Sequence, residues 1–172
     1  PDFNMENEGF EEGLDSWLVW PTDLSNYSLE TTGNGIFGSD DTFEALEGMN
    51  SLKIWGQYSG TYPNNTPVYQ GFNVEEYGLS AGDHVVAYGS MMSHADDWIG
   101  QGTNSAYLFI SFFDENWTML QSTLGPMMDG SKTASEWHDF DVTAEVPAGA
   151  VNMNVGVEYW QVSGDDHGSV YF

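Results

Sequence analysis

The strongest constraint on the fold comes from two long apolar runs in the middle of the chain, His84–Met92 and Ala106–Phe113. Both contain aromatic and aliphatic residues, and they flank a polar, Gly-containing loop at His94–Asn104. Aromatic and β-branched residues bounded by Gly, Asp, Asn and Ser predict two β-strands joined by a long loop. Both alternating faces of the second run are largely apolar, which predicts a central strand covered on both sides.

Short strands separated by turn residues are predicted along the rest of the chain. They are Ser16–Trp20, Tyr27–Thr32, Ser51–Trp55, Val68–Val74, Trp117–Leu124, Trp137–Val142, Val151–Trp160 and Ser169–Phe172. Only Thr42–Gly48 hints at a helical period. Many short strands with Gly-rich turns predict an all-β protein, an antiparallel β-sandwich. Without a repeat or a linker, the 172 residues are expected to form one domain, 1–172.

The charge balance excludes several classes of partner. The chain has two cations, Lys53 and Lys132, against 27 acidic residues, and its net charge is −25. Nucleic acids and anionic membrane surfaces need clustered Lys and Arg, so neutral partners remain. The excess of acid is explained by solubility in high salt, as in a marine or halophilic setting, or alternatively by cation binding.

The cellular location is less constrained. Cysteine is absent, which excludes disulfides and thiol chemistry, and no apolar run approaches a membrane span. The chain is expected to be a mature or excised module of a longer protein that is secreted or attached to the cell surface.

The order of several short motifs resembles a known family. The motifs are Asn7–Gly13 followed by Trp17, Ser51–Ile54, Val68–Gln70, Leu79–Asp83, Trp137–Phe140 with Val146–Gly149, and Gly168–Phe172. Together they resemble the jelly-roll carbohydrate-binding modules of the family 4, 9 and 22 type, which are often attached to secreted glycoside hydrolases. The resemblance implies a β-sandwich of jelly-roll type and a non-catalytic function.

The resemblance also implies a structural calcium ion where the first and last strands meet. Mapped by motif, its ligands are the Gly9 carbonyl, the Glu11 carboxylate, the Lys53 carbonyl and Asn50. Carboxylate and carbonyl oxygens are the hard ligands that Ca²⁺ requires. Second-rank candidates are the acidic pairs Asp40/Asp41, Asp96/Asp97 and Asp165/Asp166, for which solvated loops are the alternative explanation.

A sugar site needs exposed aromatic rings beside amides or carboxylates, because pyranose rings have apolar C–H faces and polar hydroxyls. The candidates that combine these properties are Trp55, Tyr58, Tyr69, Gln70, Trp98, Asn154, Glu158 and Trp160. Core packing is the alternative for any aromatic residue, and it is expected for Trp17, Phe109, Phe112 and Trp137.

Catalysis has little support in the sequence. The His residues form no close pair for a transition metal, and no nucleophile-elbow motif is present. With 27 acidic residues, a pair of carboxylates suited to glycoside hydrolysis could be chosen at will, so such a pair carries no weight.

The sequence therefore predicts a non-enzymatic module that binds a neutral β-glycan through exposed aromatic residues and is stabilised by calcium. The alternative is a calcium-dependent structural or adhesion domain of a surface layer or filament. In that alternative, exposed methionine pairs at Met91-Met92 and Met127-Met128 provide a protein interface.

Overall fold

The structure is a computed structural model that describes residues 5–20 and 26–172. The predicted domain 1–172 also includes residues 1–4 and 21–25, which lie outside the described residues. The strands are β1 (Leu18–Val19), β2 (Tyr27–Thr31), β3 (Asn50–Trp55), β4 (Asn64–Asn73), β5 (His84–Met91), β6 (Ser105–Phe113), β7 (Met119–Leu124), β8 (His138–Glu145), β9 (Asn152–Gln161) and β10 (Ser169–Tyr171). Two 3-10 helices, η2 (Ala95–Asp97) and η3 (Ile99–Gln101), lie between β5 and β6.

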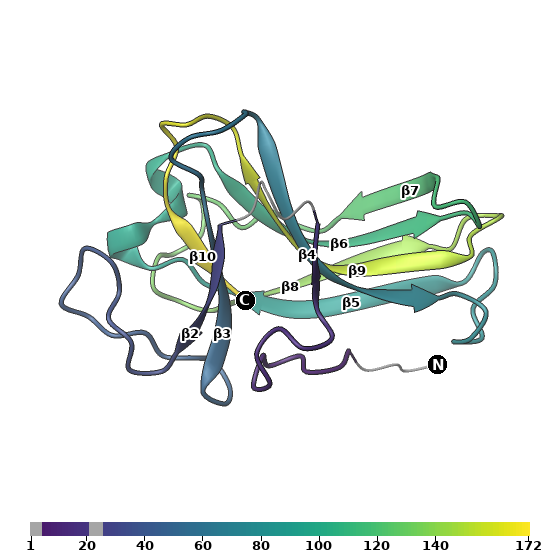
Figure 1. Ribbon diagram of the computed structural model, residues 1–172, viewed down its shortest axis with the longest axis horizontal. Helices are drawn as coiled ribbons and strands as arrows, with labels where there is room; N and C mark the ends of the chain where they lie inside the picture. The colour runs from purple at the N-terminus through teal and green to yellow at the C-terminus, as the bar shows by residue number, and fades with distance from the viewer. Residues whose placement is uncertain (1–4, 21–25) are drawn as a thin grey trace.

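The strands form two packed layers of antiparallel sheet (Figure 1). One layer is a five-stranded sheet in the order β1-β4-β9-β6-β7. The other combines a three-stranded sheet, β10-β3-β2, with the pair β5-β8, and a single bridge between Met92 and Tyr171 joins them. This arrangement confirms the predicted all-β antiparallel sandwich.

The core fills the space between the two layers. Val68, Ile110 and Val155 come from the five-stranded sheet, while Leu52 and Phe140 come from the opposite layer, and all are buried. Since side chains alternate between the faces of a strand, the residues between these core positions must point away from the sandwich core. β6 lies between β9 and β7, which confirms the predicted central strand.

The β5–β6 loop crosses from one layer to the other, so the two apolar runs that flank it lie in different sheets. The Ser93 hydroxyl accepts a hydrogen bond from the Ile99 amide, and Asp97 accepts one from the Ser169 hydroxyl. These contacts fix the loop against β10.

Strand β4 begins earlier than predicted and runs through Pro67. The Val74 amide donates to the Val151 carbonyl. Counted back from Val74, every second residue of β4 therefore directs its backbone N–H and C=O toward β9, and the backbone nitrogen of Pro67 points away from β9. On that side β1 pairs only with Val68 and Tyr69. Pro67 therefore occupies an edge position, where its missing N–H removes no ladder bond.

Three expectations are corrected. Thr42–Gly48 is not helical, because Phe43 is pulled inward to stack on Tyr171, with ring centroids 4.7 Å apart. The first predicted strand shortens to Leu18–Val19, since Ser16 adopts a left-handed φ of 71°. Of the four residues in the two methionine pairs, three are buried.

Met91, Met92 and Met128 are buried, and of these two pairs Met127 alone is exposed. The two sheets close over these side chains, because β5 ends in the bridge to β10 and Met128 pairs with Ala106. The observation that favoured a protein-interaction surface is therefore removed.

No helix in the described part of the chain is long and apolar enough to cross a bilayer.

Candidate functional site

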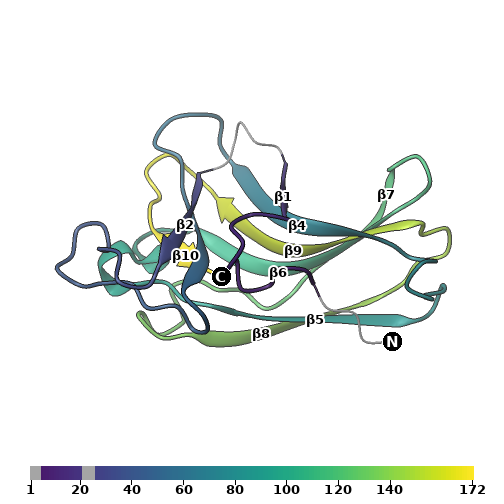
Figure 2. The same ribbon diagram turned by 60° about the horizontal axis from the view of Figure 1, so that its bottom comes forward.

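The side of the five-stranded sheet that faces away from the second layer is called the outer face here. Figure 2 shows β4, β9 and β6 curving so that this face is concave. Register places its side chains in four successive rungs across these strands. The rungs are Asn65, Trp160 and Ser105; Pro67, Glu158 and Tyr107; Tyr69, Gly156 and Phe109; and Gly71, Asn154 and Ser111.

The third rung is an aromatic platform built around a glycine. Tyr69 and Phe109 lie on either side of Gly156, and their ring centroids are 6.4 Å apart with an interplanar angle of 67°. A Cβ at Gly156 would come within 2.6 Å of the Tyr69 Cα. The rings approach each other because this strand position has no side chain.

The second rung carries a carboxylate that is almost removed from solvent. Glu158 is 8% exposed, and its Oε1 accepts a hydrogen bond from the Asn65 amide. Burial raises the pKa of the Glu158 carboxyl above its usual value, and hydrogen bonds from Asn65 and Trp160 offset only part of that rise. The neighbouring Trp160 is exposed at the end of the strand.

The fourth rung contains an unsatisfied acceptor. Asn154 is buried, and its Oδ1 has no hydrogen-bond partner among the described residues. Next to it, the Ser111 and Ser122 hydroxyls share a hydrogen bond of 2.8 Å. A buried amide oxygen without a partner costs about 1–3 kcal/mol, and a ligand hydroxyl at this rung would relieve that cost.

The structure divides the predicted sugar-site residues among several places. Tyr69, Asn154, Glu158 and Trp160 share the outer face. Trp55 and Tyr58 instead line a separate pocket beside β3 and β10.

The remaining two lie elsewhere. Gln70 is buried on the opposite side of β4, and its amide exchanges hydrogen bonds with the Glu6 backbone. Trp98 packs against the core in the β5–β6 loop, over Gly100.

Sequence reasoning missed several residues of the outer face: Asn65, Tyr107, Phe109, Ser111 and Ser122. Phe109 was expected in the core. It is buried, but register places it beside Gly156 on the outer face, and it is not in the core cluster. The sequence signal for the orientation of Phe109 is the alternation of side chains along β6. Both faces of β6 are apolar, so the alternation does not show which face points outward.

The other residues expected in the core behave differently from Phe109. Phe112 is fully buried between the layers, as predicted. Trp17 is partly buried and stacks on Phe10, and Trp137 is partly buried against the smaller cluster around Phe43.

Three of the predicted calcium ligands lie together. Glu11 Oε1 accepts hydrogen bonds of 2.8 Å from the amides of Met49 and Asn50, and Gly9 lies on the same turn as Glu11. A cavity of about 370 Å³ beside them is lined by Glu8, Glu11, Glu12 and Glu47, together with Asn7, Gly9 and Gly48. This concentration of carboxylates fits the oxygen-rich environment that Ca²⁺ takes.

Lys53 lies outside that cavity. It occupies the central strand β3, and it pairs with Ser28 on one side and Tyr171 on the other. The Trp55 amide donates to Asn26, and the same alternation turns the Lys53 carbonyl toward β2. The fourth predicted ligand is thus a residue of the sheet ladder.

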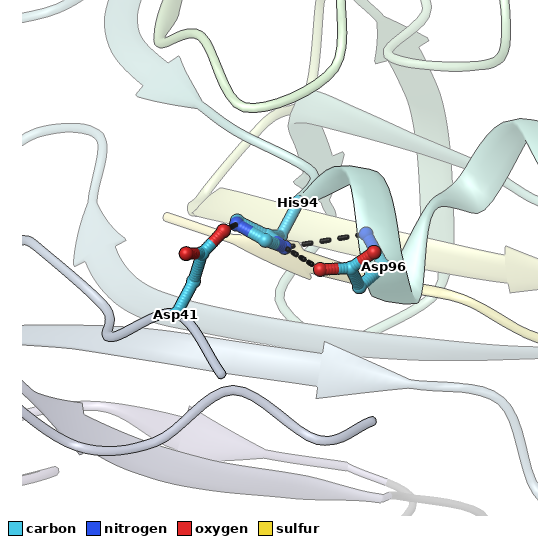
Figure 3. Close-up of side chains that lie close together, drawn as sticks. All are labelled: Asp41, His94 and Asp96. Carbon is cyan, nitrogen blue, oxygen red and sulfur yellow. Dashed lines mark hydrogen bonds and ion pairs between the residues drawn. The ribbon is translucent and has the colours of Figure 1, made fainter. Parts of the chain in front are cut away.

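A separate group of metal-ligating side chains joins two of the second-rank acidic candidates (Figure 3). His94 Nε2 lies 3.5 Å from Asp41 Oδ2, and His94 Nδ1 lies 3.9 Å from Asp96 Oδ2. His94 Nδ1 already accepts a hydrogen bond from the Asp96 amide. The two carboxylates lie next to opposite ring nitrogens, which ties the β2–β3 and β5–β6 loops together, and one ligand atom from each of the three residues lies within 4.8 Å of the other two.

The third acidic pair has a structural role. The Asp166 carboxylate accepts hydrogen bonds from the Thr103 hydroxyl and amide, and from Ser163. The bond from the Thr103 hydroxyl is the main cause that lowers the pKa of Asp166. Asp166 thereby links the β9–β10 loop to the start of β6.

No protein-family model matches the sequence, and no curated protein matches it. Solved structures do match. The xylan-binding domain CBM22-2 of Paenibacillus barcinonensis Xyn10C aligns with a TM-score of 0.56 at 16% identity, covering 95% of this chain and 92% of that one. A carbohydrate-binding module of the β-sandwich superfamily gives a TM-score of 0.58 at 12% identity, covering 95% and 57%.

The enzymatically active domain of tailspike protein 4 from bacteriophage CBA120 also aligns, with a TM-score of 0.56 at 15% identity. That match covers 96% of this chain but only 20% of the tailspike structure, so the chain spans one fifth of it. Where the match extends over most of the other chain, the similar structures are carbohydrate-binding modules. The chain resembles the β-sandwich carbohydrate-binding modules, and it has their fold.

Proposed function

We propose that this chain is a non-catalytic module that binds a neutral β-glycan on the outer face. The observation that carries the proposal is the combination of buried polar groups, Asn154 and Glu158, with the Tyr69–Phe109 platform on one concave surface. The partly exposed ring of Tyr69 can stack on the C–H face of a pyranose, next to the buried Phe109 ring, and the amide and carboxylate oxygens accept hydrogen bonds from sugar hydroxyls. A net charge of −25 opposes acidic polysaccharides.

The similarity in fold supports this class of ligand, and xylan is the first polymer to test because one similar domain binds it. In this proposal the chain is one domain of a larger secreted or cell-surface protein. Binding would hold its partner domains close to the polymer and raise their effective concentration there.

Replacing Asn154 by alanine separates binding from stability. The Asn154→Ala variant removes the unpartnered oxygen, so its free energy of unfolding should equal or exceed that of the unmodified protein. Its affinity for the glycan should fall about 5-fold, because about 1 kcal/mol of hydrogen bonding is lost. Isothermal titration with xylo-oligosaccharides and urea denaturation measure the two quantities. Unchanged affinity would remove Asn154 from the site.

Calcium is proposed to bind beside Glu11 and to stabilise the turn that Glu11 holds against Met49 and Asn50. Added Ca²⁺ should raise the melting temperature, EDTA should reverse the increase, and Glu11→Gln should abolish it. Glu145→Gln, an exposed position on β8, controls for the loss of one charge. A calcium shift that persists in Glu11→Gln would place the ion elsewhere, with Asp41 and His94 the next position to test.

The raised pKa of Glu158 predicts a pH-dependent stability. A carboxyl with a raised pKa contributes stability that is present below its unfolded pKa of about 4.3 and is lost as pH rises through the folded pKa. Glu158→Gln stays neutral, so its free energy of unfolding relative to the unmodified protein should increase from pH 4 to pH 7. Urea denaturation at several pH values measures this. Parallel curves for the two proteins would contradict it, and Glu145→Gln again serves as the control.

A further inference from the structure

A second pocket lies beside the sheet formed by β10, β3 and β2, and it shares no residue with the outer face. Its volume is about 290 Å³. The lining residues come from β2, the β2–β3 loop, β3, the segment after β3, η2 and the β9–β10 loop, and they include Glu30, Lys53, Trp55, Tyr58, Asp97 and His167. Figure 1 shows β2, β3 and β10, the strands of this sheet, close together.

The polar side of this pocket is an ordered ion pair. Lys53 Nζ lies 3.3 Å from Asp97 Oδ2, which also accepts a 2.7 Å hydrogen bond from the Ser169 hydroxyl. Burial opposes the charge of Lys53, but interactions with Tyr171 and Asp97 outweigh it and raise the pKa of the ammonium. Glu30 adds a second carboxylate to the lining.

The other walls of the pocket are aromatic. Lys53 Nζ is 5.8 Å from the centroid of the Trp55 ring, so this ring lies next to the ion pair. Tyr58 is exposed and tilts against His167, with ring centroids 4.9 Å apart. Phe37 is exposed on the β2–β3 loop. Rings that are held in place yet remain open to solvent are free to stack on a ligand.

The charges of the lining oppose an anionic ligand. An anion would face the carboxylates of Glu30 and Asp97 on a chain whose net charge is −25, and the Lys53 ammonium is already paired with Asp97. A neutral ligand with adjacent hydroxyls matches both groups, since one hydroxyl can accept from Nζ while its neighbour donates to a carboxylate. Such charge-assisted hydrogen bonds are stronger than neutral ones.

We propose that this pocket is a second carbohydrate site that takes one pyranose ring, stacked on Trp55 and Tyr58 and hydrogen-bonded to the Lys53–Asp97 pair. Its volume lies at the low end for ligand pockets, which suits one ring and not an extended chain. The ring is either a free monosaccharide or the end of a glycan. In the proposed function the outer face binds along a glycan chain, and it shares no residue with this pocket, so the two sites are expected to bind independently.

Methyl β-xyloside, methyl β-glucoside and methyl β-galactoside are the probes. Titrated one at a time, at least one should shift the indole N–H resonance of Trp55, which is assigned from the Trp55→Phe variant. The expected affinity is about millimolar, because so small a ligand buries few atoms. Tyr58→Ala should weaken binding at least about 5-fold, as expected for the loss of a stacking ring.

Two matched variants complete the test. Tyr88→Ala removes a tyrosine on β5 that is exposed like Tyr58, and Tyr69→Ala removes the outer-face platform. Both should leave the Trp55 shift unchanged. The proposal is overturned if no glycoside shifts this resonance at concentrations up to about 50 mM, far above a millimolar dissociation constant. It is also overturned if Tyr58→Ala binds as well as the unmodified protein.

Xylohexaose distinguishes the two sources of the ring. If the pocket takes a chain end, the hexasaccharide shifts the Trp55 resonance in the Tyr69→Ala variant as well. If it takes a free monosaccharide, only the methyl glycosides do so. Loss of xylohexaose binding in Tyr69→Ala, with glycoside binding retained, supports two independent sites. Failure of the outer-face function would leave the pocket result intact.

Discussion

Replacing Tyr69 with alanine should abolish retention of the protein in an affinity gel that contains xylan or another neutral β-glycan. Tyr69 packs edge-on against Phe109 over Gly156, at the centre of the outer face. Central aromatic residues in a binding surface contribute about 2 kcal/mol or more, which corresponds to about a 30-fold loss of affinity. Isothermal titration with oligosaccharides that the unmodified protein binds gives the affinity ratio.

Two controls keep this result interpretable. Tyr88→Ala removes an exposed tyrosine from β5, in the other layer, and should leave retention unchanged. The melting temperature of Tyr69→Ala shows whether the sandwich still forms, because Tyr69 lies outside the core cluster. If Tyr69→Ala is folded and binds every glycan as before, the outer face is not the glycan site.

Replacing Gly156 with alanine should destabilise the sandwich strongly. A Cβ at Gly156 would lie 2.1 Å from the Val68 carbonyl oxygen and 2.6 Å from the Tyr69 Cα, both of which are backbone atoms of β4. Backbone cannot move aside as a flexible side chain can, so β4 and β9 would have to separate. Forcing extra atoms into a packed site costs about 1–3 kcal/mol and occasionally more, and we expect about 3 kcal/mol here.

The corresponding fall in melting temperature is about 6–12 °C, at about 2–4 °C per kcal/mol for a domain of this size. Gly35→Ala is the matched control, since no atom lies within 4 Å of its Cβ position. That variant should change the free energy of unfolding by less than about 0.5 kcal/mol. A Gly156→Ala protein as stable as Gly35→Ala would contradict the close approach of the two strands.

Gly156 also connects stability to binding. Its missing side chain allows Tyr69 and Phe109 to approach across β9, so displacement of β4 would disturb the platform as well as the ladder. Gly156→Ala is therefore expected to weaken glycan binding even at temperatures where the protein remains folded. Tyr69→Ala, in contrast, should reduce binding with a smaller loss of stability.

The alternation along Val151–Trp160 was sufficient to predict a strand with a polar face, and that face includes Asn154, Glu158 and Trp160 on the outer side of the sheet. It did not reveal that Gly156 is as important as its neighbours, because its role depends on how close β4 comes. Phe109 was assigned to the core because an apolar residue in an apolar strand has no local signal for its orientation.

Aromatic content alone grouped Trp55 and Tyr58 with Tyr69 and Trp160. The structure separates them, since β3 and β4 follow each other in sequence but lie in different layers. The amino-acid composition contains no property that distinguishes Trp55 and Tyr58 from Tyr69 and Trp160. Sheet assignment decides the separation, and it depends on which strands pair at long range.

The sequence by itself determined the strand segments and the sandwich class, and its net charge predicts uncharged partners, because side-chain alternation and net charge are properties of local segments and of composition. Only the tertiary structure decided which side chains share a surface. Tyr69, Gly156 and Phe109 meet because β4, β9 and β6 pair in one register, although they are far apart along the chain. A shift of one residue in that register would turn every one of these side chains to the other face, so the site exists only once the strands have paired.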